Sequence, residues 1–363
     1  MDLDNILGQD HIKEKILRSI EKNKYPQSKI ILDRDGYGGL NFAVEIAKGL
    51  LKKNEFFKGD ILDHPDLYFA YPTFADKQTS QDLLSEWLKL VKQNIYIDFK
   101  DWKDTNTNVQ GKIRKAEIDQ IHKKAHLKSY IGGFKVFIIW DVQKLDSYSQ
   151  NRLLKLLEEP PEKTFFLLIS KSLDLLLSTI ISRCQISNLN PINPIEHERY
   201  LQVNFKTSNE KLIAKSSRGS ISRSINYINS NSTSIFYEES FVECLRFAFL
   251  AKKSKKAVLD LTNWSKQISS TSREQQKEFL AYCSFLIREA MLLSFKAPNL
   301  VSFSSSSNFK IHNLAPFIHS KNIIEIISLI EDSHYSVSRN VNSKIVFTSF
   351  AIKMTKLINR SED

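Results

Sequence analysis

The sequence is poor in cysteine and contains no long apolar run. Its three cysteines, Cys184, Cys244 and Cys283, are widely spaced and odd in number, which excludes a disulfide framework and a zinc site of four thiolates. The N-terminus is acidic and lacks the apolar segment of a signal peptide. No stretch approaches the roughly 18 uninterrupted apolar residues that span a bilayer. We therefore expect a cytoplasmic protein.

Acidic residues are fewer than basic ones, with 41 Asp and Glu against 52 Lys and Arg and a net charge of +11. This excess favours a polyanionic partner such as nucleic acid, although a basic surface without a partner gives the same balance. Apolar residues make up 42% of the chain and charged residues 26%, which excludes a disordered or fibrous protein. A length of 363 residues is enough for two or three domains.

Short apolar runs alternate with amphipathic segments in the first half of the chain. The pattern predicts buried strands at 28–32, 64–70, 135–141 and 164–170, and helices over 9–24, 40–52, 81–92, 112–129 and 149–159. Because these strands are apolar on both faces, we expect an α/β domain with a parallel sheet that helices cover on both sides. This domain is expected to cover residues 1–190.

Beyond Pro191 the sequence predicts helices only. Short helices over 208–217 and 220–228, with Gly219 as a cap between them, indicate a small helical domain over residues 191–232. The polar residues 229–234 are interpreted as a linker. Helical periodicity then continues to Leu357, interrupted by a serine-rich loop at 302–307, and predicts an all-helical domain over residues 233–363.

A glycine-rich turn lies between the first strand and the following helix, as in a phosphate-binding loop. That loop has the pattern G-x-x-x-x-G-K-[ST], in which backbone amides hold the phosphates, the lysine reaches the β and γ oxygens and the hydroxyl holds Mg²⁺. Aligned on Gly38, with Gly36 inside the turn, this chain has Asp33 in place of the first glycine. Gly39 replaces the lysine and Leu40 the hydroxyl residue. We interpret the turn as a degenerate nucleotide loop, with an acidic Asp33 that would repel a triphosphate.

A carboxylate also ends the strand at 135–141. In an active nucleotide hydrolase this strand carries an Asp for Mg²⁺ and a Glu that positions water. Here Asp141 is present, but Val142 stands in the Glu position. The sequence therefore predicts no intrinsic ATPase activity, and a turn or capping role explains Asp141 equally well.

Two stretches carry a specific resemblance to a known family. The segment 151–161 reads N-R-L-L-K-L-L-E-E-P-P, and the segment 178–185 reads S-T-I-I-S-R-C-Q. They resemble the N-x-L-L-K-x-L-E-E-P-P helix and the T-I-x-S-R-C box of the bacterial DNA polymerase III clamp-loader subunits, members of the AAA+ superfamily. Shorter matches are L-G-Q at 7–9, G-S-I-S-R at 219–223 and R-N-V-N-S-K at 339–344. With both nucleotide motifs incomplete, the chain most resembles the delta-prime type.

The resemblance implies an AAA+ core, a helical lid and an all-α collar that joins the subunits of a ring. It implies a non-hydrolysing subunit, whose partners are the motor subunits, a delta-type subunit, primer–template DNA and, indirectly, the sliding clamp. ATP would be bound by the partner subunits, and this chain would need no cofactor. Many relatives hold zinc with cysteines before a His-Pro-Asp element, but residues 52–63 contain no cysteine, so no zinc is expected.

The same resemblance assigns roles to three further residues. Arg183 of the S-R-C box would enter the ATP site of a neighbouring subunit as an arginine finger, where a guanidinium offsets charge on the γ-phosphate; an ordinary surface arginine is the alternative. Ser170 and Arg223 match the sensor-1 and sensor-2 positions. Because the loop is degenerate, we expect both to have a structural role.

The basic segment 112–135 is a candidate DNA contact, through phosphates and without sequence preference. Its candidate residues are Lys112, Arg114, Lys115, Lys123 and Lys124. A solvated helix face explains the segment equally well. Two other functions stay open at this point, an AAA+ ATPase with an atypical loop and a stand-alone nucleic-acid-binding protein.

Overall fold

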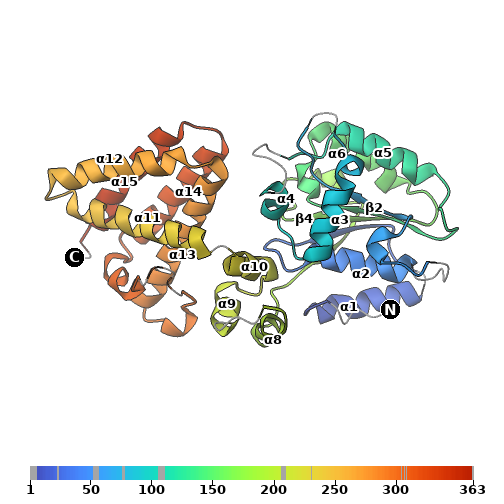
Figure 1. Cartoon of the computed structure of the whole chain (residues 1–363), viewed down its shortest axis with the longest axis horizontal. Helices are drawn as coiled ribbons and strands as arrows, with labels where there is room; N and C mark the ends of the chain where they lie inside the picture. Colours follow the sequence, from blue (N-terminus) through green and yellow to red (C-terminus); the bar gives the residue numbers. More distant parts are fainter. Residues whose placement is uncertain are drawn as a thin grey trace. The chain divides into compact units, whose positions relative to one another are not determined.

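The computed structural model describes residues 6–22, 24–51, 57–75, 78–104, 111–205, 210–229, 231–303, 305, 307 and 309–361 (Figure 1). The chain divides into two compact units, Met1–Asn226 and Tyr227–Asp363. Each unit has a hydrophobic core of its own. Within the described ranges, no helix combines the length and the apolar character that crossing a membrane requires.

The first unit is built on a parallel sheet. Its strands are β1 (Ser28–Leu32), β2 (Leu67–Ala70), β3 (Lys135–Ile139), β4 (Thr164–Ser170) and β5 (Gln185–Asn188), in the order β2-β3-β4-β1-β5. The register pairs Leu32 with Ser170, so the segments that follow β1 and β4 leave the sheet side by side. Because ligands of open α/β sheets bind beyond the carboxyl ends of the strands, this edge is where a site is expected.

Helices cover both faces of the sheet, which confirms the predicted fold class. They are α1 (Asp10–Glu21), α2 (Gly39–Leu51), α3 (Leu84–Gln93), α4 (Phe99–Asp104), α5 (Lys115–His126), α6 (Ser147–Glu158) and α7 (Ser178–Ile181). Successive strand residues point to opposite faces. Ile31 and Leu167 pack in the cluster that contains α1 and α2, whereas Ile30 and Leu168 pack in the cluster that contains α5 and α6.

Three helices complete the first unit, α8 (Pro194–Phe205), α9 (Glu210–Ser216) and α10 (Ile221–Asn229), with the boundary between the units inside α10. Gly219 has φ +78° and lies so close to Ile192 that a Cβ would come within 2.6 Å of its backbone nitrogen, so the turn before α10 requires glycine. Residues 191–226 share one compact unit with the sheet. The predicted separate lid domain over 191–232 stays a prediction.

The second unit is helical throughout its described elements. Its α-helices are α11 (Asn231–Leu250), α12 (Lys255–Ser270), α13 (Arg273–Ser294), α14 (Ile323–Ser338) and α15 (Ser343–Ile358). Trp264, Phe279 and Phe347 are buried together at its centre. The interpretation of 229–234 as a linker is wrong, because α10 extends to Asn229 and α11 begins at Asn231. Asn, Ser and Thr are frequent at helix starts as well as in loops, so composition alone does not distinguish the two.

Candidate functional site

The glycine turn after β1 is occupied by a carboxylate of the chain itself. Asp33 is buried, and its Oδ1 accepts a hydrogen bond from the backbone N–H of Tyr37 at 2.6 Å. Its Oδ2 accepts from the N–H of Gly39 at 2.7 Å. Backbone N–H groups of such a turn are the donors that hold phosphate in a nucleotide loop. The carboxylate of Asp33 therefore takes the place of a phosphate oxygen rather than merely repelling one.

The start of α10 and the ring of Tyr96 leave no open space over the glycine turn. Gly36 has φ +81°, and a Cβ there would lie 2.8 Å from the side chain of Ser222. Gly38 has φ +103°, and a Cβ there would lie 2.7 Å from the ring of Tyr96. Both glycines are thus required by backbone conformation and by close packing. A nucleotide would have to displace Ser222 and Tyr96.

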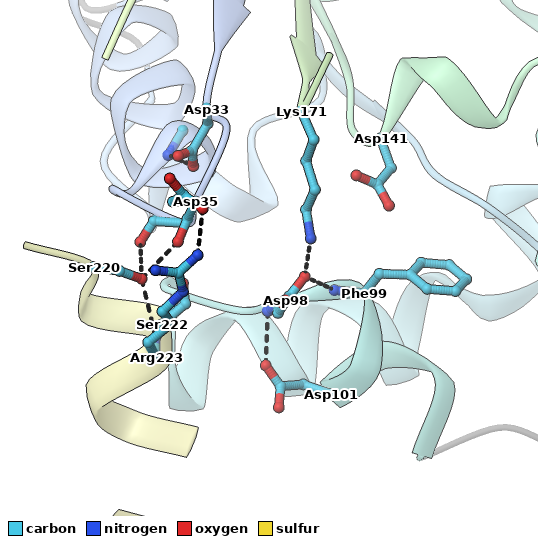
Figure 2. Close-up of polar contacts among 12 residues, drawn as sticks. Asp33, Asp35, Asp98, Phe99, Asp101, Asp141, Lys171, Ser220, Ser222 and Arg223 are labelled. Atoms are coloured by element: carbon cyan, nitrogen blue, oxygen red, sulfur yellow. Dashed lines mark hydrogen bonds and ion pairs between the residues drawn. The ribbon is translucent and has the colours of Figure 1, made fainter. Parts of the chain in front are cut away.

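Hydrogen bonds from the start of α10 fix the closed arrangement (Figure 2). Ser220 donates its hydroxyl to the carbonyl oxygen of Asp35 at 2.6 Å and accepts from the N–H of Arg223 at 3.1 Å. Ser222 donates to the carbonyl oxygen of Tyr96 at 3.0 Å. The Arg223 guanidinium pairs with the Asp35 carboxylate. That pair is 49% and 39% exposed, so we expect the buried serine bonds to contribute more than the ion pair.

Lys171 brings an ammonium group into the centre of the site. It directly follows β4, and Figure 2 shows its side chain reaching Asp98, with which it forms an ion pair. Burial acts to raise the pKa of Asp98, but the charge and hydrogen bond of Lys171 outweigh it and hold that pKa below the usual value. Burial acts to lower the pKa of Lys171, but Asp98, Asp141 and Asp33 together raise it. The ammonium therefore stays charged among three carboxylates.

Asp141 follows β3 at the same edge and is 2% exposed. Its φ is +56°, and its Oδ1 accepts a hydrogen bond from Gln143 at 2.9 Å. Burial raises the pKa of Asp141, an effect that the charge of Lys171 opposes. Val142 beside it and Leu40 across the turn are buried apolar residues. The position that would orient water and the loop position whose hydroxyl would hold Mg²⁺ thus carry no polar group, whereas the carboxylate of Asp141 is present.

Ser170, at the sensor-1 position, is fully buried. Its hydroxyl lies 2.7 Å from the carbonyl oxygen of Ser172 and 3.1 Å from Oε1 of Gln143. Ser170 therefore stabilises the segment that follows β4, next to Lys171. Arg223 contacts the degenerate loop through Asp35.

Arg183 follows the short helix α7 by two residues. Its Nη2 is 2.6 Å from Oε1 of Glu158, and its Nη1 donates to the carbonyl oxygen of Thr179 at 3.0 Å. The guanidinium side chain is 36% exposed. The two family-like segments, the E-E-P-P helix end and the S-R-C box, are thus joined by this ion pair.

The basic candidates divide into exposed and engaged side chains. Lys112, Lys115 and Lys123 are exposed. Arg114 donates to the carbonyl oxygen of Thr73 at 2.9 Å. Lys124 donates to Gln81 at 3.0 Å and lies over the ring of Tyr68, and burial lowers its pKa. Lys115 also lies over an aromatic ring, that of Tyr148, so exposure is what distinguishes the first three lysines from Arg114 and Lys124.

Sequence reasoning missed Lys171, Asp98 and Tyr96. A signal existed for Lys171, because it directly follows a predicted parallel strand, where site residues collect. Asp98 and Tyr96 lie in an irregular stretch between β2 and β3. No periodicity places such residues, and only the folded structure brings them to the sheet edge.

Comparisons with known proteins agree with the motifs. Residues 8–193, just over half of the chain, match the family model described as "DNA polymerase III, delta subunit". The chain is 33% identical over 138 residues to the DNA polymerase III subunit delta' of Buchnera aphidicola subsp. Baizongia pistaciae, covering 36% of this chain and 40% of that protein. It is 25% identical over 228 residues to the DNA polymerase III subunit tau/gamma of Haemophilus influenzae, covering 61% of this chain and 29% of that protein.

Among solved structures, a DNA polymerase III gamma subunit-related protein from Thermotoga maritima has a TM-score of 0.44 and 15% identity, covering 95% of this chain and 99% of that chain. The chain spans half or less of the length of the curated relatives named above.

Proposed function

The chain belongs to the DNA polymerase III delta subunit family, and from this premise we propose that it is a non-hydrolysing, delta-prime-type subunit of a clamp loader. In this role it stabilises the ring of loader subunits. It also supplies Arg183 to the ATP site of a neighbouring subunit while the sliding clamp is loaded onto primer–template DNA. Catalysis then belongs to the complex, and this chain contributes a transition-state group to the active site of another chain.

The observation that supports this proposal most is that the backbone N–H groups of the turn after β1, which would hold phosphate in a nucleotide loop, are already occupied by a carboxylate. The carboxylate of Asp33 uses the N–H groups of Tyr37 and Gly39. Ser220 and Ser222, at the start of α10, already hold this helix against the turn. In a motor subunit, bound nucleotide supplies such bonds and hydrolysis removes them. Here side chains of the chain itself form these hydrogen bonds, so no nucleotide has to bind or leave, which favours a subunit that holds one conformation throughout the cycle.

Arg183 has the chemistry that the second part of the proposal needs. A guanidinium placed in trans against a γ-phosphate typically accelerates hydrolysis by about 10³–10⁵. Arg183 is partly exposed and is held by one carboxylate at the chain surface. An exposed ion pair of this kind contributes about 0–1 kcal/mol. A neighbouring triphosphate, with its higher charge, would readily compete with Glu158 for the guanidinium.

The remaining partners follow from the same role. Motor subunits and a delta-type subunit would contact this chain, and ATP would be bound by the motor subunits, with no cofactor held in this chain. The exposed Lys112, Lys115 and Lys123 are the best candidates for contacts to DNA phosphates. Such a subunit works where DNA is replicated, so a cytoplasmic location is part of the proposal.

Titration of the purified chain with MgATP tests the non-hydrolysing part. We expect no saturable binding heat up to about 1 mM, the upper end of ordinary enzyme affinities, and no phosphate release. An active P-loop ATPase under the same conditions serves as the positive control. Binding in the micromolar range, with turnover that co-purifies with the chain, would contradict the proposal and favour the ATPase with an atypical loop.

A further inference from the structure

A basic cleft lies on the sheet face that α1 covers, away from the degenerate loop. It has a volume of about 460 Å³ and is bounded by α1 and by strands β1 and β5. The ionisable side chains that line it are His11, Lys15, Lys24 and Lys29. Within the described part of the chain, the lining contains three lysines and no Asp or Glu. A concave site with charge of one sign selects ligands of the opposite sign.

Lys29 forms the buried end of this cleft, and the strand register explains why. Lys29 pairs with Gln185 of β5, and Ile31 pairs with Ser187, so Lys29, Gln185 and Ser187 point to the same face of the sheet. The Nζ of Lys29 donates to Oε1 of Gln185 at 2.6 Å and to the hydroxyl of Ser187 at 3.0 Å. It also lies 5.5 Å from the centre of the Tyr25 ring.

All of these partners are neutral, although Lys29 is only 3% exposed. Burial lowers the pKa of Lys29 to about 8, and burial is the one cause of that shift. A buried ammonium that lacks a paired anion is costly to the fold. The two hydrogen bonds use two of its three protons. Among the residues that the structure describes, Lys29 thus pairs with no carboxylate, and it keeps one further donor in a side chain that lines the cleft.

Two exposed lysines stand where a ligand would enter. Lys15 belongs to α1 and Lys24 to the segment that follows it, and both side chains are exposed. Among the described ion pairs, neither lysine appears with a carboxylate partner. Lys13, on the same helix, is paired with Asp10 at 3.3 Å and does not line the cleft.

We propose that the cleft between α1 and β5 is a binding site for a phosphate dianion, with Lys29 at its closed end and Lys15 and Lys24 at its mouth. The phosphate is carried either by a small phosphomonoester or by the 5′ end of a nucleic acid strand. This site is independent of the degenerate loop and of Arg183. Its success or failure therefore leaves the proposed function untouched.

Calorimetric titration of the full chain with inorganic phosphate, at constant ionic strength set with sodium chloride, tests the site. We expect saturable binding, weakened about ten-fold or more by Lys29→Met, as for loss of a charge-assisted hydrogen bond. Lys13→Met is the matched control and should bind phosphate as the wild type does. Absence of binding to the wild type, or equal binding to Lys29→Met, would overturn the proposal.

A second variant keeps the test valid if Lys29→Met is unfolded by circular dichroism. The double variant Lys15→Ala/Lys24→Ala leaves the buried strands intact, and it too should weaken phosphate binding. Unchanged phosphate binding in a folded double variant would contradict the proposed role of Lys15 and Lys24 at the opening of the cleft. Competition then identifies the carrier: a 5′-phosphorylated oligonucleotide that displaces phosphate, where its 5′-hydroxyl counterpart does not, indicates a strand end. Displacement by glycerol phosphate alone indicates a small phosphomonoester.

Discussion

Arg183 and Glu158 form an ion pair within the chain, with Nη2 of the arginine 2.6 Å from Oε1 of the glutamate. Glu158 is the last residue of α6, and Arg183 follows α7 by two residues. The pair thus links the two segments that most resemble clamp-loader subunits. If Arg183 acts in trans, it must exchange this carboxylate for a phosphate.

Replacing Glu158 by Gln should therefore ease the release of Arg183. Because the pair is partly exposed and worth about 0–1 kcal/mol, we expect ATP hydrolysis by a reconstituted loader to rise, by up to about five-fold. Steady-state phosphate release measures the effect. A loss of hydrolysis as large as that caused by removing Arg183 would show instead that Glu158 orients the guanidinium productively.

The effect of the close packing of α10 on the glycine turn can be separated from the effect of backbone strain. Gly36 and Gly132 both have φ +81°, but only at Gly36 would a Cβ meet another residue, Ser222 at 2.8 Å. Gly132→Ala measures the strain alone, whereas Gly36→Ala adds the collision. We expect Gly36→Ala to lower the free energy of unfolding by about 1–3 kcal/mol more than Gly132→Ala. Equal losses in urea denaturation would contradict the packing described for α10.

Removing the ammonium of Lys171 should lower the free energy of unfolding at neutral pH more than at acidic pH. The folded pKa of Asp98 lies below its ordinary value. The contribution of this pair is therefore present above the unfolded pKa of about 3.9 and is lost as the pH falls through the folded value. Lys171→Met should lower the free energy of unfolding by about 1–3 kcal/mol at pH 7, after allowance for partial exposure. The loss should shrink below pH 4.

Lys92 offers the control for this prediction. Its side chain is 40% exposed, as is that of Lys171, but its partner Asp63 lies on an open surface. Lys92→Met should change stability much less than Lys171→Met at pH 7. If the loss in Lys171→Met is the same at pH 3 and pH 7, the charge of Lys171 is not what stabilises the site.

The exposed lysines near α5 predict a salt dependence. If Lys112, Lys115 and Lys123 contact phosphates, replacing all three by Ala should reduce the slope of log K against log salt for DNA binding by the loader by about 2–3. Fluorescence anisotropy at several salt concentrations measures it. Replacing Lys252, Lys253 and Lys256, which are also exposed, is the control with the same change in charge. An equal effect of both sets would indicate bulk charge rather than contacts.

The sequence was sufficient for the strands that are buried on both faces. β1, β3 and β4 are fully buried, so their apolar runs are unbroken. β5 was missed because it is a four-residue edge strand whose only buried residue is Ser187. α8 was missed as well, although it has twelve residues, because no regular apolar stripe marks it.

The predicted end of one helix was wrong, and the fold shows which side chain caps its true end. The basic helix predicted over 112–129 ends at His126, and Lys135 belongs to the buried strand β3. Its ammonium donates to the carbonyl oxygens of Ala125 and Leu127 at the end of α5. A lysine in this position satisfies the free carbonyl groups of a helix C-terminus. Lys135, which the sequence analysis included in the basic segment 112–135, is therefore a buried helix cap and not an exposed charge.

For the candidate site, the sequence predicted which nucleotide-binding groups are missing but not which side chains take their place. The missing lysine and hydroxyl of the loop are visible in the sequence at Gly39 and Leu40. The hydrogen bonds from the backbone amides of the turn to Asp33 depend on the geometry of the turn. The ion pair between Lys171 and Asp98 depends on a contact between residues 73 positions apart. Neither relationship leaves a local pattern.

The most direct test of the proposed function is ATP hydrolysis by the reconstituted loader with Arg183→Ala in this chain. Arg152→Ala is the matched control, because Arg152 is also a partly exposed arginine with a carboxylate partner, Asp119. We predict a loss of at least about ten-fold for Arg183→Ala, within the range of an arginine finger, and wild-type hydrolysis for Arg152→Ala. Assembly, checked by size-exclusion chromatography, should be intact in both. Unchanged hydrolysis in a fully assembled Arg183→Ala loader would contradict the proposed role in trans.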